Sequence, residues 1–268
     1  MGNIIFSTDI ITAADAAITP RSESSGYSDE NIMDHWHLKR RFRAADLTKS
    51  DTNPLLRIDM SAAKTVVAVV LEDCNFDKTR IKGHASDLTT NWAGASFGGT
   101  EVTVSAHPAT GRYNIYIPLT GFNYRWLAVM TPAAASAVGS YVTYWEVGRV
   151  VILDSVIELT SNMDYGFSQR VMQQYADIKL PTGSPERIDL SGGVKQWMCR
   201  VVFGRRTAAE VSELFSVGGL DMSYPMVFYL NRGTSSEVAV CVKDGHVGAT
   251  WRAYNIYEGA DLDLVELV

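Results

Sequence analysis

The sequence predicts an all-β protein with one short helix, arranged as two β-rich domains. Segments rich in β-branched and aromatic residues recur at short intervals between turn signals. The composition of 21 Gly, 12 Tyr and 6 Trp also favours β-structure. At 268 residues, the chain is long enough for two domains that each bury a core. We therefore expect a β-sandwich over residues 1–155 and a second β-rich domain over residues 156–268.

The first domain contains seven or eight short strand candidates. Residues 55–60 and 65–71 are apolar and rich in β-branched side chains, and residues 61–64 between them predict a turn. Further strands are expected at 79–85, 100–105, 113–119 and 125–130. Because no long helix pattern occurs before residue 155, these strands predict a β-sandwich.

The stretch 141–153 is predicted to join the two domains. If it is extended, Tyr144 and Glu146 lie on one face and Trp145 and Val147 on the other. The run 150–153 is apolar at every position, which favours a strand that is buried on both sides. We expect its first part to close the sandwich and its last part to lead rigidly towards the second sheet.

The second domain is predicted to carry one helix on a sheet. The capping-box sequence from Thr207 to Glu210 starts a helix near 207–217, and the glycines at 218–219 stop it. Alternating apolar residues around Trp197 predict a central strand. Strands are also expected at 226–230, 238–242, 250–257 and 261–267, with hairpin turns at 231–233 and 243–245.

The overall charge and the apolar runs exclude several classes of partner. A net charge of −6 argues against nucleic acid, because that binding depends on neutralising phosphates. The longest aliphatic run, 66–71, is far shorter than the ~20 residues that cross a bilayer. The first 20 residues lack the basic start of a secretory signal, so we expect synthesis in a cytoplasm and no membrane insertion.

Neither the cysteines nor the histidines predict a metal or a cofactor. The cysteines Cys74, Cys199 and Cys241 are odd in number and widely separated, so we expect three reduced core residues. His35 and His37 would share a face of a strand and could ligate zinc or copper. No further ligand is announced nearby, so we favour packing or surface histidines and expect no metal.

The basic run at 39–43 and four aromatic residues are the candidate contact residues. Arg40, Arg41 and Arg43 could contact phosphate, an acidic glycan or an acidic partner, although a solvated or interface face is the simpler interpretation. Four aromatic side chains could stack on a sugar ring, although most of them are expected in the core: Tyr27, Trp36, Trp92 and Trp126. Because Trp92 lies in a glycine-rich loop, it is the best candidate for an exposed ring.

Catalysis is not expected. No nucleophile elbow of the G-x-S-x-G type is expected, and the chain lacks a P-loop, a dinucleotide-binding glycine pattern, H-E-x-x-H and C-x-x-C. The carboxylate pairs Asp73 with Asp77 and Asp261 with Asp263 could flank a glycosidic bond, but acidic residues in turns and on solvated strands are far commoner. We therefore predict that the protein is not an enzyme.

Residues 26–153 resemble discoidin-like (coagulation factor 5/8 C-type) jelly-roll domains, particularly those of tailed-bacteriophage structural proteins. The resemblance rests on the strands 56–60 and 66–71 and on the last strands, 125–129 and 144–151. Met60-Ser61 stands where such domains usually carry Leu-Gly. Residues 164–268 are similar, in the order of their elements, to phage tail-tube and distal-tail β-sandwich domains.

The resemblance implies a structural role in a virion tail. It implies synthesis in the bacterial host cytoplasm, a threefold or sixfold homo-oligomeric ring, and docking to other tail or baseplate proteins. The alternative is a carbohydrate-binding module for attachment to a host surface glycan, with Trp36 and Trp92 as contacts. A glycan hydrolase is the third possibility.

Overall fold

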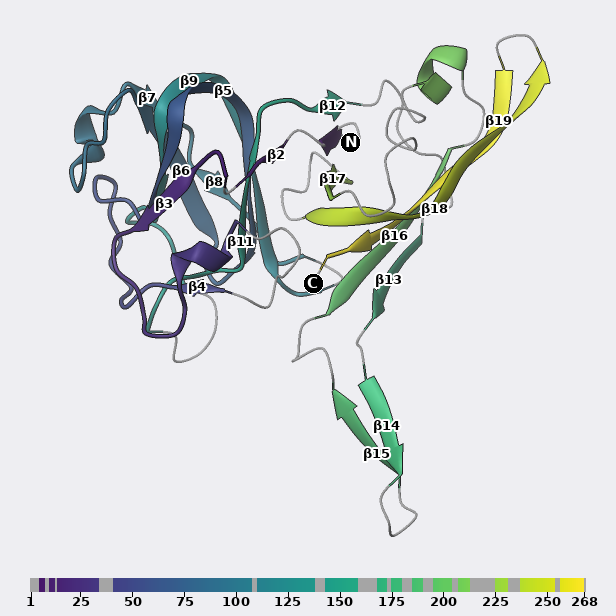
Figure 1. The fold of residues 1–268 in the computed structure, drawn as a ribbon, viewed down its shortest axis with the longest axis horizontal. Helices are drawn as coiled ribbons and strands as arrows, with labels where there is room; N and C mark the ends of the chain where they lie inside the picture. The colour runs from purple at the N-terminus through teal and green to yellow at the C-terminus, as the bar shows by residue number, and fades with distance from the viewer. Residues whose placement is uncertain are drawn as a thin grey trace.

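The chain folds into two large antiparallel sheets that lie side by side (Figure 1). The structure is a computed structural model that describes residues 5–267 except 8–9, 13, 34–40, 108–109, 138–142, 159–167, 173–174, 180–184, 190–194, 204–206, 213–224, 231–236 and 254–255. Within this part of the chain, one α-helical segment occurs, at 208–212, with two short 3-10 turns. The predicted all-β fold with one short helix is confirmed.

The eight-stranded sheet, with a small two-stranded sheet beside it, forms what we call the first unit. Its strand order is β2 (Ile10–Ile11), β11 (Arg149–Leu153), β5 (Leu56–Cys74), β9 (Tyr113–Met130), β6 (Lys78–His84) and β7 (Phe97–Gly98). Attached to these are β3 (Ala17–Pro20) on β5 and β8 (Val102–Thr103) on β6, and β10 (Glu146–Val147) pairs with β4 (Phe42–Arg43). The 3-10 turns are η1 (Asp29–Asn31) and η2 (Trp92–Gly94).

The seven-stranded sheet forms the second unit. Its order is β12 (Ile157–Glu158), β1 (Ile5–Ser7), β17 (Met226–Tyr229), β18 (Val238–Ala253), β19 (Ile256–Glu266), β16 (Gln196–Phe203) and β13 (Ser168–Met172). The hairpin of β14 (Tyr175–Lys179) and β15 (Pro185–Asp189) continues from β13 and β16 and stands away from the sheet (Figure 1). The strand β1 therefore joins the second unit, although the predicted boundary would assign it to the first domain; the two-domain division itself stays a prediction.

The two longest strands of the first unit, β5 and β9, are strongly curved along their length (Figure 1). Their pairing shifts register between Asp59 and Lys64, where Ser61 has φ 63°. On β9, Gly121 has φ 76°, a left-handed conformation that glycine adopts without steric cost. The predicted turn at 61–64 is wrong, because a bulge bends the strand there without reversing it.

The strand β11 is buried on both faces, as its unbroken apolar run predicted. Val150 and Ile152 belong to the core inside the first unit. Val151 and Leu153 point the other way, into an apolar cluster shared with the second unit. The second unit contributes these residues to the cluster: Val227, Tyr229, Val238 and Val240. The last part of the 141–153 stretch is thus a strand of the first unit whose outer face supports the second.

Local signals in the second unit have mixed outcomes. The Thr207 hydroxyl accepts from the Glu210 amide at 3.4 Å, and the Glu210 carboxylate accepts from the Thr207 amide at 2.8 Å, so the capping box is confirmed. Residues 213–217 of the predicted helix lie outside the described residues. The predicted turn at 243–245 is wrong, because β18 continues through it with a register shift after Asp244.

Two further expectations concern the cysteines and membranes. The three cysteines are free and buried, which confirms that they are reduced core residues. No helix among the described residues is long and apolar enough to span a bilayer.

Candidate functional site

A compact group of aromatic, basic and acidic side chains lies on the surface of the first unit. The strands β4 and β10 pair so that Arg43 is directly opposite Glu146. The Arg43 guanidinium donates from Nε at 3.1 Å and from Nη2 at 2.8 Å to Oε2 of Glu146. Cross-strand pairing of opposite charges therefore holds Arg43 in one orientation.

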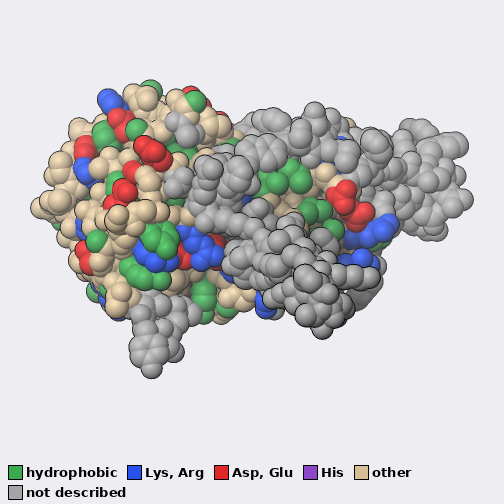
Figure 2. Space-filling view, turned by 60° about the horizontal axis from the view of Figure 1, so that its bottom comes forward, with side chains coloured by type: hydrophobic (Ala, Val, Ile, Leu, Met, Phe, Trp, Pro, Cys, Tyr) green, Lys and Arg blue, Asp and Glu red, His purple; other side chains and the backbone are tan. Residues whose placement is uncertain are grey.

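Two tyrosine rings enclose the Arg43 guanidinium. Its Cζ lies 3.9 Å from the ring centroid of Tyr27 and 3.9 Å from that of Tyr144. Tyr27 is 36% exposed, one of two large apolar side chains exposed to this extent in the described part of the chain. Figure 2 shows Lys or Arg side chains between hydrophobic ones on this face of the first unit. Such stacking adds cation–π attraction to the ion pair.

Arg41 extends the group towards the protein interior. It donates from Nη1 to Glu146 at 2.7 Å, and its Nη2 lies 2.6 Å from Oδ2 of Asp73. Burial raises the pKa of Asp73, and the charge of Arg41 only partly opposes this. Burial lowers the pKa of Arg43, but the hydrogen bonds and charge of Glu146 outweigh it, so the net shift is upward.

We call Tyr27, Arg41, Arg43, Tyr144 and Glu146 the aromatic–arginine cluster. It contains the two basic residues of the run 39–43 that the structure describes, Arg41 and Arg43, and both form ion pairs. Arg40 and Trp36 lie outside the described residues, as do His35 and His37. Among the residues with a described position, no group of three or more His, Cys, Asp or Glu is placed to hold a metal ion.

The expectation that Trp92 is exposed is wrong. Its side chain is fully buried, against Ala128 and Met130 on the outer side of β9. Its indole N–H donates to the Thr89 carbonyl at 3.1 Å, and Lys82 donates to the Trp92 carbonyl at 3.0 Å. The loop folds back because this large apolar ring covers a face of the sheet that water would otherwise reach. A ring in this position presents no face to a sugar.

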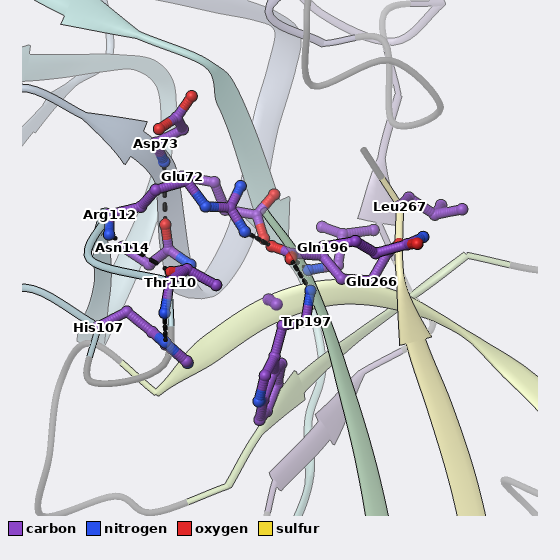
Figure 3. A network of polar contacts seen from close by, with 12 residues as sticks. Glu72, Asp73, His107, Thr110, Arg112, Asn114, Gln196, Trp197, Glu266 and Leu267 are labelled. Carbon is purple, nitrogen blue, oxygen red and sulfur yellow. Dashed lines mark hydrogen bonds and ion pairs between the residues drawn. The ribbon is translucent and has the colours of Figure 1, made fainter. Parts of the chain in front are cut away.

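A buried polar network joins the two units next to the cluster (Figure 3). Glu72 and Arg149 are both fully buried, with Oε2 and Nη1 2.9 Å apart. Each also reaches the second unit. Glu72 accepts from the Val240 amide at 2.6 Å, and Arg149 donates to the Leu267 carbonyl at 2.8 Å.

A second ion pair crosses between the units. Arg112 of the first unit pairs with Glu266 of β19, which also accepts from the Trp197 amide at 2.8 Å. Burial raises the pKa of Glu266 to about 7, although the charge of Arg112 opposes the shift. Asn114 adds a neutral link by donating to the Val238 carbonyl at 2.7 Å and accepting from the Asp73 amide at 3.0 Å.

This interunit network, formed by Glu72, Arg112, Asn114, Arg149 and Glu266, holds the units in a single orientation. Its two acidic and two basic side chains balance in charge, and each carboxylate also accepts a backbone amide. Directional bonds of this kind specify a unique docking geometry, whereas the apolar cluster beside them supplies non-directional attraction. The network therefore supports the expected rigid joint.

The partners of three of the four carboxylates in the proposed pairs are described. Asp73 is engaged by Arg41, and Asp77 accepts from the Ser136 amide at 2.8 Å. The side chain of Asp261 lies outside the described residues, and Asp263 lies 3.7 Å from Arg200.

One sequence pattern was missed. Residues 94–98 read G-A-S-F-G, and the Ser96 hydroxyl lies 2.8 Å from Nδ1 of His84. A catalytic serine of this motif sits on a turn from a strand to a helix, whereas Ser96 follows η2 and precedes β7. The Ser96 amide also donates to the same His84 nitrogen at 3.2 Å. The contact therefore anchors the loop, and no carboxylate of a described residue is recorded against His84.

Comparisons with known proteins find no matching family model and no matching curated protein. Similar solved structures include CBM32-3 from a family 31 glycoside hydrolase of Clostridium perfringens. The two sequences are 12% identical, the match covers 55% of this chain and 95% of that chain, and the TM-score is 0.41. Another similar structure is the family 32 CBM of C. perfringens NanJ in complex with galactose, which is 10% identical; the match covers 55% of this chain and 98% of that chain, with a TM-score of 0.38.

A third similar structure covers more of the chain. It contains the CBM32-1 and CBM32-2 domains of C. perfringens ZmpB in complex with GalNAc. The sequences are 8% identical, the match covers 96% of this chain and 87% of that chain, and the TM-score is 0.43. None of these three TM-scores exceeds 0.43, so the function proposed below rests on the geometry of this chain.

Proposed function

We propose that the protein is a non-catalytic carbohydrate-recognition protein that binds sugar at the aromatic–arginine cluster. The observation that carries this proposal is the stack of Arg43 between Tyr27 and Tyr144 at a surface where Tyr27 remains 36% exposed. An exposed ring face can stack on the C–H face of a pyranose. Polar groups at its edge can then bond the hydroxyls.

The cluster retains hydrogen-bonding capacity for such a ligand. Arg43 uses Nε and Nη2 on Glu146, and its Nη1 has no recorded partner among the described residues. Tyr27 and Tyr144 also each carry a phenolic hydroxyl, which can both donate and accept a hydrogen bond. Because Glu146 and the two tyrosine rings already fix the orientation of the Arg43 guanidinium, the Arg43 side chain would lose little further conformational entropy when a ligand binds.

The charge balance of the cluster favours a neutral ligand. Arg41 and Arg43 face Glu146 and Asp73 at contact distance, so the positive charge is already neutralised. A phosphate or a nucleic acid needs uncompensated cations, and the whole chain carries a net charge of −6. A polyhydroxylated sugar requires donors and acceptors without net charge.

The test is a glycan array followed by calorimetry. Galactose and N-acetylgalactosamine are the first probes, because two of the similar structures hold these sugars. We expect Arg43→Met to weaken binding about tenfold or more, because a hydrogen bond to a charged group is lost. Tyr27→Ala should weaken binding about tenfold, because the ring that stacks on the sugar is lost. Arg125→Met is the matched control, since Arg125 is an exposed arginine paired with Asp59 and close to the Trp126 ring. Equal losses in the control, or no glycan binding at all, would refute the proposal.

A second candidate function is assembly into a larger particle, and the β14–β15 hairpin favours it. These strands pair only with each other among the described residues, and the hairpin projects from the second unit (Figure 1). A lone two-stranded hairpin is marginally stable in water, so a partner protein would stabilise it. A bacteriophage tail tip, with a threefold or sixfold ring of this chain docked to other tail or baseplate proteins, is the assembly we propose.

Assembly is tested with the arm removed. Replacing residues 175–189 by a short Gly-Ser linker should abolish oligomers seen by analytical ultracentrifugation and leave glycan binding intact. A full-length chain that stays monomeric at high concentration and is absent from intact virions by mass spectrometry would contradict this second function.

A further inference from the structure

The exposed face of the second unit carries a shallow hollow on four neighbouring strands. In β16, the side chains of Trp197, Cys199 and Val201 are buried, whereas Met198 and Arg200 are not. Alternation along the strand therefore separates a core face from an outer face. The hollow lies on the outer face and encloses about 220 Å³.

A charged row crosses this hollow in strict cross-strand register. Ser168 of β13 is opposite Arg200 of β16, Arg200 is opposite Asp263 of β19, and Asp263 is opposite Asp244 of β18. Strands in a sheet lie about 4.8 Å apart, so the row is roughly 14 Å long. On the second unit, Figure 2 shows acidic and basic side chains side by side.

An apolar row runs beside the charged one. Arg170, Met198, Val265 and Val242 are paired across the same four strands. The three apolar side chains are half-buried, and Arg170 at the end is exposed. The hollow thus offers an apolar strip along one side and alternating donors and acceptors along the other.

The charges of the hollow are balanced, and two of them keep bonding capacity. Asp244 and Asp263 are directly opposite, an arrangement in which like charges repel. Arg200 Nε forms an ion pair with Asp263 Oδ1 at 3.7 Å. In the described part of the chain, neither Arg170 nor Asp244 has a recorded ion pair. The side chains of Arg170 and Asp244 can therefore bond to a ligand.

We propose that this hollow is a second binding site, for a neutral oligosaccharide. Carboxylates only accept and guanidinium groups only donate, so the row matches a ligand whose hydroxyls do both. Two arginines and two aspartates together give no net attraction for a phosphate or for a cation. Because the row is longer than one pyranose ring, it suits several linked sugars. The site lies on the other unit and is independent of the aromatic–arginine cluster.

The test is a titration of the isotopically labelled full-length protein, followed by amide NMR shifts. The probes are neutral hexasaccharides of glucose, galactose and N-acetylglucosamine at about 10 mM, enough to saturate a site with a Kd of about 1 mM. We expect shifts at Arg200 and Asp263 and at least tenfold weaker binding in Asp263→Asn and in Arg170→Met. Asp154→Asn, an exposed carboxylate outside the hollow, is the control and should bind normally.

The outcomes separate the two sites. Shifts in the hollow that persist in Tyr27→Ala protein support the second site whether or not the cluster binds sugar. The inference is overturned if no neutral probe shifts the hollow amides, if both hollow variants bind like Asp154→Asn, or if only oligogalacturonate or hexalysine binds there.

Discussion

Removing Arg149 alone should destabilise the protein strongly, and removing its partner as well should restore most of the loss. Arg149→Met leaves the Glu72 carboxylate fully buried beside Val240 with no cation in contact. Breaking a buried ion pair in this way costs about 3–5 kcal/mol. In Glu72→Gln combined with Arg149→Met, neither member of this pair is charged, and the amide oxygen of Gln can still accept from the Val240 amide. The double variant should then lose only about 1–2 kcal/mol, mainly the bond to Leu267.

The assay is urea unfolding at equilibrium, monitored by tryptophan fluorescence and by far-ultraviolet circular dichroism. Both charges bond to the backbone of the second unit, so Arg149→Met should also uncouple the units and separate the two transitions. For a chain of this size, a loss of 3–5 kcal/mol corresponds to a fall in Tm of roughly 10 °C. If the single variant lost less than about 1 kcal/mol, or the double variant were no more stable than the single one, our interpretation of the network would be wrong.

Three other variants test separate features. Trp92→Ala should lower the free energy of unfolding by about 3–5 kcal/mol in urea, because the ring is fully buried, and a loss below 1 kcal/mol would contradict its place in the core. Gly121→Ala should cost about 1–2 kcal/mol by the same assay, since a side chain is strained at φ 76°; an unchanged midpoint would argue against the bend. For Glu266, burial raises the pKa from 4.5 to about 7, so the folded protein holds a proton that the unfolded chain has lost. The stabilisation from Glu266 is therefore complete below about pH 4.5 and lost as pH rises through 7, and Glu266→Gln should gain stability relative to wild type across that window. Burial lowers the pKa of His107 to about 4, so His107 has the opposite effect and lowers the stability of the folded protein as the pH falls. A difference in stability between Glu266→Gln and wild type that does not change with pH would refute the raised pKa of Glu266.

Features that depend on neighbouring residues along the chain were predicted well. The capping box from Thr207 to Glu210 forms because its two bonds link residues three apart. The run 150–153 is apolar at every position, and β11 is indeed covered on both sides. By contrast, the turns expected at 61–64 and 243–245 are bulges. Small and polar residues suit both, and only the pairing strand decides between bending and reversing.

The candidate site was predicted in part. The basic run pointed to Arg41 and Arg43, but Glu146 lies 103 residues from Arg43 in sequence. One signal was available, because Tyr144 and Glu146 share a face of an extended strand. Nothing in the local pattern brings Tyr27 to the same place. The expected exposure of Trp92 was wrong for the same reason, because its burial depends on Ala128 and Met130, which lie on a strand distant in sequence.

The sequence by itself determined the all-β class, the short helix, the reduced cysteines and the strand that is buried on both sides. Each follows from composition or from a periodicity of a few residues, which short-range sterics and burial translate directly into structure. Only the tertiary structure decided that β1 joins the second sheet, that Trp92 is buried, and that four charged side chains form ion pairs at the contact between the units. These outcomes depend on pairing between distant strands. A buried charge is tolerated only where a distant partner meets it, and no local pattern names that partner.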